Sequence, residues 1–316
     1  MMTSTSSRPA IAVTGLRKSF GDHVVLDGID LNVPAGTVFS LLGANGAGKT
    51  TTVKILSTLS RADAGEARVA GYDVAREPDA VRASIGVTGQ FSAVDKLFTG
   101  EENLRLMADL HQLGRAEGRR RIARLLDQFG LTDAARKPSS AYSGGMMRRL
   151  DLAMTLMGSP EVIFLDEPTT GLDPRSRRDM WQIVRDLVAD GVTIFLTTQY
   201  LDEADELADR IAVLDGGRVV AEGTAEELKR RIPGGHVRLK FAGPEGVDAA
   251  LGVLGQASRD NDALSLRVPS DGSLRSLKTL IDRLDERAIE VDELSVHTPD
   301  LDDVFLALTD EKVTVR

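Results

Sequence analysis

The sequence contains no cysteine among its 316 residues, a single tryptophan, and few aromatic side chains, 4% in all. Without cysteine the chain cannot form disulfides, thiolate metal sites or a cysteine nucleophile, and the absence favours a reducing compartment. No uninterrupted apolar run reaches the ~18 residues that a membrane-spanning helix needs. The first residues show no charged leader followed by an apolar stretch, so we expect a cytoplasmic location.

Basic side chains are too few to balance the acidic ones, 39 against 48, and the formal net charge is -9. Nonspecific binding to nucleic acid depends on clustered lysine and arginine, so this balance argues against a nucleic-acid partner. The acidity is concentrated in residues 234–316, which carry 16 acidic and 10 basic side chains. Together with the turn signal Pro233-Gly234-Gly235, this shift predicts a boundary between two domains, 9–232 and 235–316.

Short apolar runs alternate with helical spacing from Ser143 onward, which is typical of a parallel sheet with helices on both faces. The runs VIFL at 162–165 and TIFL at 193–196 are apolar throughout, as expected of strands buried on both sides. We therefore expect an α/β fold for residues 9–232. The predicted strands are 11–13, 24–26, 37–42, 162–165, 192–197 and 211–214, and the predicted helices include 175–189 and 225–232.

A helical insertion is predicted inside this domain. Apolar residues in the stretch Thr99–Phe129 recur at intervals of three and four, and a helix is expected from Ser143 to about Met157. We assign a helical subdomain to about residues 91–158. For a run of arginines in this stretch, a solvated helix face is the simpler interpretation than a partner surface. The run consists of Arg115, Arg119, Arg120, Arg121 and Arg124.

Residues 235–316 show the order strand, helix, two strands, helix, strand, followed by a last helix over Leu301–Leu308. This order resembles a split βαβ, or ferredoxin-like, α+β module. Its final strand is predicted at Ile289–Leu294. The four histidines of the chain have no spacing that suits a metal site.

A glycine-rich loop, GANGAGKT at residues 43–50, fits the pattern G-x-x-x-x-G-K-[ST] between a strand and a helix. Its glycines let successive backbone N–H groups converge on phosphate oxygens, and the helix N-terminus adds partial positive charge. We expect Lys49 to bridge the β- and γ-phosphates and Thr50 to bind Mg²⁺. The alternative is a tight glycine turn without a ligand. The predicted nucleotide contacts here are Gly43, Asn45, Gly46, Gly48, Lys49, Thr50 and Thr51.

Two carboxylates follow the apolar strand at residues 162–165. They stand at its carboxyl end, where open α/β sheets bind their ligands. We assign Asp166 to Mg²⁺, directly or through water, and Glu167 to polarising the water that attacks the phosphate. The alternative is that both residues simply cap the following helix.

A second anion-binding helix start lies between these motifs, at Tyr142-Ser143-Gly144-Gly145-Met146. With DEPTTGLDP after the carboxylate strand, these motifs resemble those of ATP-binding cassette (ABC) ATPases over about residues 9–230. Residues 43–50 are similar to the Walker A motif, 142–146 to the signature motif, 162–167 to Walker B and 171–173 to the D-loop.

The resemblance implies a head-to-tail homodimer with each ATP between Walker A of one copy and the signature motif of the other. Ser143, Gly144 and Gly145 would then face the γ-phosphate across the interface. Asp173 corresponds to the D-loop aspartate of the nucleotide site.

Two further positions match family residues. Gln90, in VTGQ, matches the Q-loop glutamine that reaches Mg²⁺ and the attacking water. Phe20 matches the aromatic residue that stacks on adenine, although ordinary core packing is an alternative.

Gln199 follows the strand where the family normally has a histidine that contacts the γ-phosphate. Glutamine can donate a hydrogen bond but cannot take a proton, which leaves Glu167 as the expected base. A surface residue that opens the next helix is the alternative.

The segments TTQYLDEADELADR, AYSGGMMRRLD and HTPDLDDVFLALT closely resemble daunorubicin/doxorubicin resistance ATP-binding subunits. This implies a subunit at the cytoplasmic face that pairs with a membrane permease and exports an antibiotic or lipid. The C-terminal domain is implied to assist that assembly, or else LDDVFLAL closes its own core. The competing function is that of a soluble, non-transport ABC ATPase.

Overall fold

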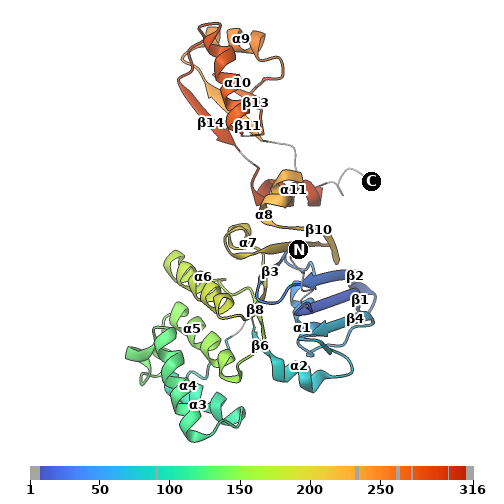
Figure 1. Ribbon diagram of the computed structural model, residues 1–316, viewed down its shortest axis with the longest axis vertical. Coiled ribbons are helices and arrows are strands. Elements are labelled where there is room, and N and C mark those ends of the chain that lie inside the picture. Colours follow the sequence, from blue (N-terminus) through green and yellow to red (C-terminus); the bar gives the residue numbers. More distant parts are fainter. Residues whose placement is uncertain are drawn as a thin grey trace, which may run out of the picture. The chain divides into compact units, whose positions relative to one another are not determined.

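The computed structural model describes residues 8–89, 92–231, 235–260, 264–271, 273–297 and 299–310 (Figure 1). The chain divides into two compact units, Met1–Ala225 and Glu226–Arg316. Helix α8 (Ala225–Arg231) is therefore part of the second unit from its second residue on, whereas the sequence places the boundary after this helix. Residues 232–234, at that predicted boundary, lie outside the described residues.

A six-stranded sheet with the order β10-β9-β3-β8-β7-β6 forms the centre of the first unit. Neighbouring strands are parallel except at the edge, where β10 runs antiparallel to β9. Every residue of β7 and β8 is buried, which confirms the prediction from their apolar runs. The strands are β3 (Val38–Leu42), β6 (Ile85–Thr88), β7 (Val162–Asp166), β8 (Thr193–Thr198), β9 (Arg210–Asp215) and β10 (Arg218–Gly223).

A second, antiparallel sheet in this unit has the order β2-β1-β4-β5. Strand β4 and helix α2 were not predicted, because each buries too few side chains to produce a clear apolar pattern. The strands are β1 (Ile11–Phe20), β2 (His23–Val33), β4 (Ala64–Val69) and β5 (Tyr72–Asp73). The helices of the unit are α1 (Lys49–Leu56), α2 (Pro78–Ser84), α3 (Gly100–Leu110), α4 (Arg115–Gln128), α5 (Gly144–Thr155), α6 (Pro174–Ala189) and α7 (Leu201–Leu207).

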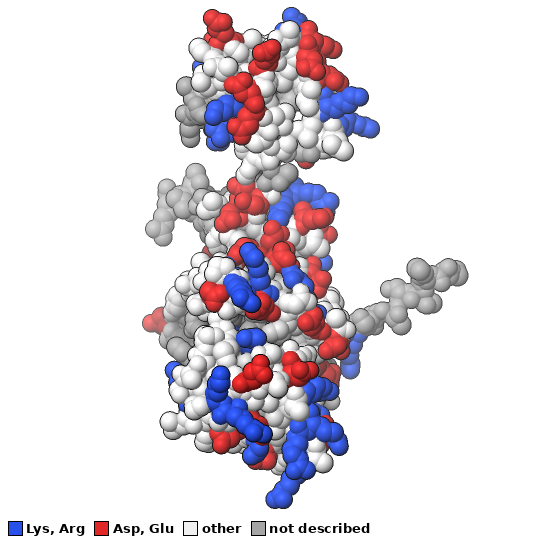
Figure 2. Space-filling model, turned by 90° about the vertical axis from the view of Figure 1, so that its left-hand side faces the viewer, with Lys and Arg blue, Asp and Glu red and all other residues white. Residues whose placement is uncertain are grey.

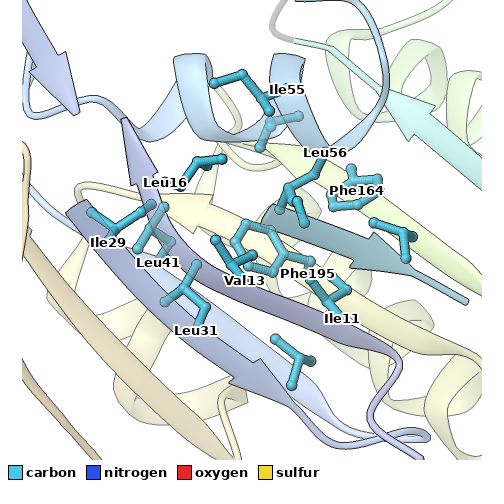
Figure 3. Close-up of a cluster of buried hydrophobic side chains, with 14 of the residues drawn as sticks. Ile11, Val13, Leu16, Ile29, Leu31, Leu41, Ile55, Leu56, Phe164 and Phe195 are labelled. Carbon is cyan, nitrogen blue, oxygen red and sulfur yellow. The ribbon is translucent and has the colours of Figure 1, made fainter. Parts of the chain in front are cut away.

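The six-stranded sheet separates two hydrophobic cores. Phe164 and Phe195 pack with side chains of α1, β1 and β2 on one face (Figure 3). The ring of Phe195 also stacks on Phe39, with the centroids 5.6 Å apart. Alternate residues of the same strands, such as Ile163 and Ile194, join the core formed with α3, α4, α5 and α6 on the other face. This two-sided burial fixes the strands whose ends carry the predicted motifs.

The predicted helical region contains α3, α4 and α5, which share one core. Thr99 and Glu102 form a capping box that begins α3. The arginine run on α4 is exposed, as predicted, except for Arg121. The guanidinium of Arg121 donates to the Met157 carbonyl at 2.7 Å and to Ser159 Oγ at 2.8 Å. That arginine therefore ties α4 to the segment after α5.

The second unit contains a four-stranded antiparallel sheet with the order β12-β13-β11-β14. Its elements follow one another in the predicted order β, α, β, β, α, β and then a final helix. Among the helices of the described ranges, none has both the length and the apolar character that crossing a bilayer requires. The elements are β11 (His236–Lys240), α9 (Pro244–Val253), β12 (Ser258–Arg259), β13 (Ser265–Pro269), α10 (Leu274–Asp285), β14 (Glu293–His297) and α11 (Leu301–Asp310).

The last strand of this sheet lies later in the chain than the sequence predicts. The prediction of a strand at Ile289–Leu294 is wrong at its start, because β14 begins at Glu293. The backbone N–H of Ile289 donates to the Leu284 carbonyl at 3.0 Å, so the chain is still closing the end of α10 there. The side chains of Ile289 and Val291 pack on the core from this connection rather than from a strand.

Candidate nucleotide-binding site

The predicted motifs meet at one edge of the six-stranded sheet. The glycine-rich loop follows β3, Asp166 ends β7 and is followed by Glu167, and Gln199 follows β8. Because β3, β7 and β8 are parallel neighbours or next neighbours, their carboxyl ends lie along the same edge. Gln90, predicted after β6, lies outside the described residues.

The glycines of the loop are required by its conformation. A Cβ on Gly43 would lie 2.4 Å from the Leu214 carbonyl oxygen, and one on Gly48 would lie 2.6 Å from Leu26 Cδ2. Gly46 and Gly48 also have positive φ angles, 83° and 111°, which favour glycine. The loop is held to the sheet by its first residue, whose N–H donates to the Thr198 carbonyl at 3.2 Å.

Lys49 is buried within this loop, with 4% of its surface exposed. Its Nζ donates to the carbonyl oxygens of Gly43 at 2.8 Å and Ala44 at 3.2 Å. The same ammonium lies 3.5 Å from Glu167 Oε1. A buried cation is costly unless it is paired, so these contacts hold its charge inside the curve of the loop, where it suits an anionic ligand.

Thr50 and Asp166 bring oxygen atoms together beside the loop. Thr50 Oγ1 donates to Asp166 Oδ2 at 3.0 Å, and Thr197 Oγ1 donates to Asp166 Oδ1. Asp166 is buried, and Thr51 lies half-buried one residue further into α1. A carboxylate and a hydroxyl at this separation are the oxygen donors that Mg²⁺ prefers, so the residues present fit this ion.

Glu167 adopts a left-handed backbone conformation with a φ angle of 51°, which is strained for a side chain of this kind. Its N–H donates to the Thr197 carbonyl at 3.0 Å, and its carboxylate accepts a hydrogen bond from Thr170 Oγ1 at 3.4 Å. The alternative interpretation of the two carboxylates as helix caps is wrong. The next helix, α6, begins at Pro174 and is capped by Asp173.

The predicted second anion-binding element is the start of α5. Ser143 is its N-cap and accepts a hydrogen bond from the N–H of Met146 at 3.2 Å. Ser143 and Gly144 are exposed, whereas Gly145 is buried against α6, where a Cβ would lie 2.5 Å from Ser176 Oγ. The exposed part of this turn is therefore free to approach another molecule.

Tyr142, the first residue of the predicted signature motif, has a structural partner. Its hydroxyl donates to the Ala134 carbonyl at 2.8 Å, and burial raises the pKa of the phenol. A Cβ on Gly100 would lie 2.3 Å from the Tyr142 hydroxyl, so α3 begins with a glycine where the ring passes.

Three further predicted residues have different surroundings. Asp173 accepts hydrogen bonds from the backbone of Arg175 and Ser176, and a hydrogen bond from Ser176 Oγ lowers its pKa. Phe20 is 56% exposed, so the alternative of core packing is wrong. Gln199 is half-buried directly after β8, and the N-cap of the following helix α7 is Tyr200.

Sequence reasoning missed two buried side chains that support the carboxylate turn. One is Thr197, the second hydroxyl on Asp166. The other is Arg148, which donates to the carbonyl oxygens of Asp166 and Pro168. Both lie in segments that carry the family resemblance, but the sequence assigned no role to either, because only the folding of the chain brings them to the turn.

Comparisons with known proteins agree with this arrangement. A family model described as ABC transporter matches residues 26–170. A daunorubicin resistance ATP-binding protein of Streptomyces coeruleorubidus is 50% identical over 97% of this chain and 98% of its own length. A daunorubicin/doxorubicin resistance ATP-binding protein of Streptomyces peucetius is 49% identical over 97% and 94%. A Nod factor export ATP-binding protein I of Paraburkholderia xenovorans is 37% identical over 95% and 97%.

Solved structures are similar over a smaller part of the chain. The ATP binding subunit of an ABC transporter has a TM-score of 0.63 and 30% identity, covering 70% of this chain and 92% of that one. An ATP-binding cassette in its ADP conformation has a TM-score of 0.62 and 26% identity, covering 69% and 92%. These similarities confirm the predicted fold, that of a P-loop ABC ATPase.

Proposed function

Because this chain belongs to the ATP-binding proteins of the ABC transporter family, and is an ATPase of that family, we propose that it powers an exporter. Its cargo would be an antibiotic or another hydrophobic drug or lipid, which leaves through a separate membrane permease. The main support for this proposal is the 50% identity to a daunorubicin resistance ATP-binding protein over 97% of the chain. That similarity includes the second unit, which the family model at residues 26–170 does not reach.

The loop after β3 binds the phosphates of ATP in this proposal. Lys49 supports this role, because its buried ammonium is held by loop carbonyls and Glu167 rather than by solvent. A γ-phosphate would provide a stronger partner for that ammonium than a carbonyl does. The proposed phosphate contacts are Gly43, Asn45, Gly46, Gly48, Lys49, Thr50 and Thr51, and Phe20 stacks on the adenine.

Mg²⁺ would be held by Thr50 and Asp166, whose oxygens lie 3.0 Å apart, together with Gln90 as the sequence predicts. When bound, the ion would neutralise negative charge on the phosphates. Thr197 keeps Asp166 oriented through its hydrogen bond to Oδ1.

Glu167 is the proposed base that accepts a proton from the attacking water. Its strained backbone turns the carboxylate toward Lys49 at the loop. Gln199 cannot take a proton, but its side-chain amide can donate a hydrogen bond to the γ-phosphate. The base and the hydrogen-bond donor thus come from the ends of neighbouring strands, β7 and β8.

Two copies of the chain are proposed to enclose two ATP molecules head to tail. The exposure of Ser143 and Gly144 at the start of α5 supports this, because their N–H groups can meet a phosphate bound to the other copy. Gly145 and Asp173 would lie beside that contact. ATP would then hold the dimer together, and hydrolysis would release it.

The permease is proposed to bind the helical region, which would place the chain at the cytoplasmic face of the membrane. Apolar side chains are unusually exposed there, with Leu97 at 89% and Leu110 at 67%. Leu106 precedes Leu110 by one turn on the same side of α3 and is also exposed. Such side chains are typical of a protein-binding surface.

Coexpression with a cognate permease in a drug-sensitive bacterium tests this function. Cells that contain the chain and the permease should accumulate less of a fluorescent anthracycline than cells with the permease alone. The same pair with Glu167→Gln should lose this effect, although both proteins are present in the membrane fraction. Equal accumulation with the wild-type and variant chains would contradict an ATP-driven export of this drug class.

A further inference from the structure

Arg148 is a buried arginine in α5, the helix that begins with the exposed Ser143 turn, and it is 9% exposed. Its guanidinium reaches backbone atoms of two other segments. Nε donates to the Pro168 carbonyl at 2.9 Å and Nη2 to the Asp166 carbonyl at 3.3 Å. Nη1 donates to the Gly89 carbonyl at 2.7 Å. One side chain therefore connects α5 with the turn after β7 and with the end of β6.

Asp151 completes this arrangement from the same helix. Its Oδ2 lies 3.5 Å from Arg148 Nη1, and its Oδ1 accepts a hydrogen bond from the N–H of Ala93 at 3.1 Å. The pair thus holds Gly89 on one side and Ala93 on the other, and the sequence places Gln90 directly after Gly89.

The remainder of α5 is packed firmly on the same sheet. Thr155 Oγ1 lies 3.1 Å from Thr88 Oγ1 in β6. A Cβ on Gly86 would lie 2.3 Å from Thr155 Cγ2, so α5 approaches β6 as closely as a glycine allows. Because this interface is tightly packed, it cannot absorb a displacement of the helix. The displacement therefore reaches the backbone that Arg148 holds.

We propose that Arg148 and Asp151 are positioning residues, which couple the orientation of α5 to the backbone that carries Asp166 and Glu167. This inference rests on the proposed function, in which α5 contacts ATP on the other copy. Closing of the dimer would press on the start of α5, and Arg148 would transmit that displacement to the carboxylate turn. Arginine suits this role because its planar group donates to several acceptors in fixed directions, which lysine cannot do.

The coupling predicts a selective loss of turnover. Arg148→Met should lower kcat about tenfold or more, because Asp166 and Glu167 lose their backbone support. ATP affinity should stay within about threefold of wild type, since the loop around Lys49 makes none of these contacts. Arg148→Lys, which keeps the charge but not the forked geometry, should recover only part of kcat.

Arg149 provides the matched control on the next position of α5. Its guanidinium donates to the Phe129 carbonyl at 2.9 Å, away from the carboxylate turn. Arg149→Met should remove a comparable structural hydrogen bond while kcat stays close to wild type. Asp151→Asn should also lower kcat. In the double variant with Arg148→Met, the two losses of kcat should not add, because both residues act in one arrangement.

The experiment measures phosphate release, binding of a fluorescent ATP analogue, and thermal unfolding of the full chain. Lower kcat in Arg148→Met and Arg148→Lys, with retained ATP binding and a near-wild-type Arg149→Met, supports the proposal. If kcat is unchanged in Arg148→Lys, or falls only in step with affinity and unfolding temperature, the coupling is refuted. Turnover that persists in Glu167→Gln would instead overturn the catalytic assignment, so the two failures are distinguishable.

Discussion

The two units of the chain use charge in different ways. Among the described residues, the charged residues that are buried as a whole all lie in the first unit: Lys49, Arg148, Asp151, Asp166, Glu167 and Glu203. In the second unit the core is apolar, and charged side chains gather on the surface (Figure 2). Asp260 is the exception in the described part of this unit, because only 7% of its side chain is exposed, and it is paired with Arg238 and Arg267. Burial of charge is costly, so its concentration around one sheet edge marks the first unit as the place of chemistry.

The largest expected effect is that of Glu167→Gln in the first unit. The variant keeps the shape of the side chain but removes the proposed base, so turnover should fall by about a hundredfold or more. ATP binding should persist, because Lys49 and the loop are unchanged. Phosphate release and nucleotide binding measured on the same preparation check this. Turnover near the wild-type rate would remove Glu167 as the base.

A smaller effect is expected at Gln199. Gln199→Ala should lower hydrolysis by about tenfold, the size of one hydrogen bond lost in a transition state. Gln182→Ala is a suitable control, since that exposed amide donates to Asp186 at 2.8 Å within α6. An unchanged rate of hydrolysis in Gln199→Ala would show that this residue makes no hydrogen bond that matters for catalysis.

Thr197→Val tests the support of Asp166. Valine preserves the shape of the buried side chain but removes the hydroxyl that donates to Oδ1, so turnover should fall about fivefold and require more Mg²⁺. Ser40→Ala is the control, because this buried hydroxyl in β3 has no partner within the described ranges. A magnesium dependence that stays at wild type in Thr197→Val would show that Asp166 needs no such support.

The comparison predicts the smallest effect on turnover for a change in the second unit. Leu239→Ala removes a fully buried side chain and should destabilise that unit by about 2–5 kcal/mol. ATP hydrolysis by the purified chain should stay unchanged, as it should in Leu274→Ala, where the side chain is 86% exposed. Thermal unfolding and phosphate release test both. If turnover falls together with the stability of the second unit, the claim that hydrolysis depends on the first unit alone is wrong.

The sequence predicts the site best where its residues are close together in the chain. The loop around Lys49 is one continuous stretch, and the N-cap at Ser143 depends only on its own helix. The contacts of Arg148 with Gly89 and of Thr197 with Asp166 join residues far apart in the chain, so no local pattern indicates them.

The same distinction holds for the fold. Fully apolar runs predict β7 and β8 correctly, because strands that are buried on both faces need apolar residues at successive positions. The start of β14 depends on the path of the chain after α10. A backbone hydrogen bond from Ile289 to Leu284 keeps the chain at the end of that helix, so the strand begins later. Apolar patterning could not reveal that connection.

Sedimentation of the Glu167→Gln chain, with and without MgATP, tests most directly whether nucleotide is enclosed between two copies. We predict a dimer that forms only with MgATP and is lost when Ser143→Arg is added, since a long cation would block the exposed turn. A monomer at saturating MgATP, or a dimer that is indifferent to Ser143→Arg, would contradict the account.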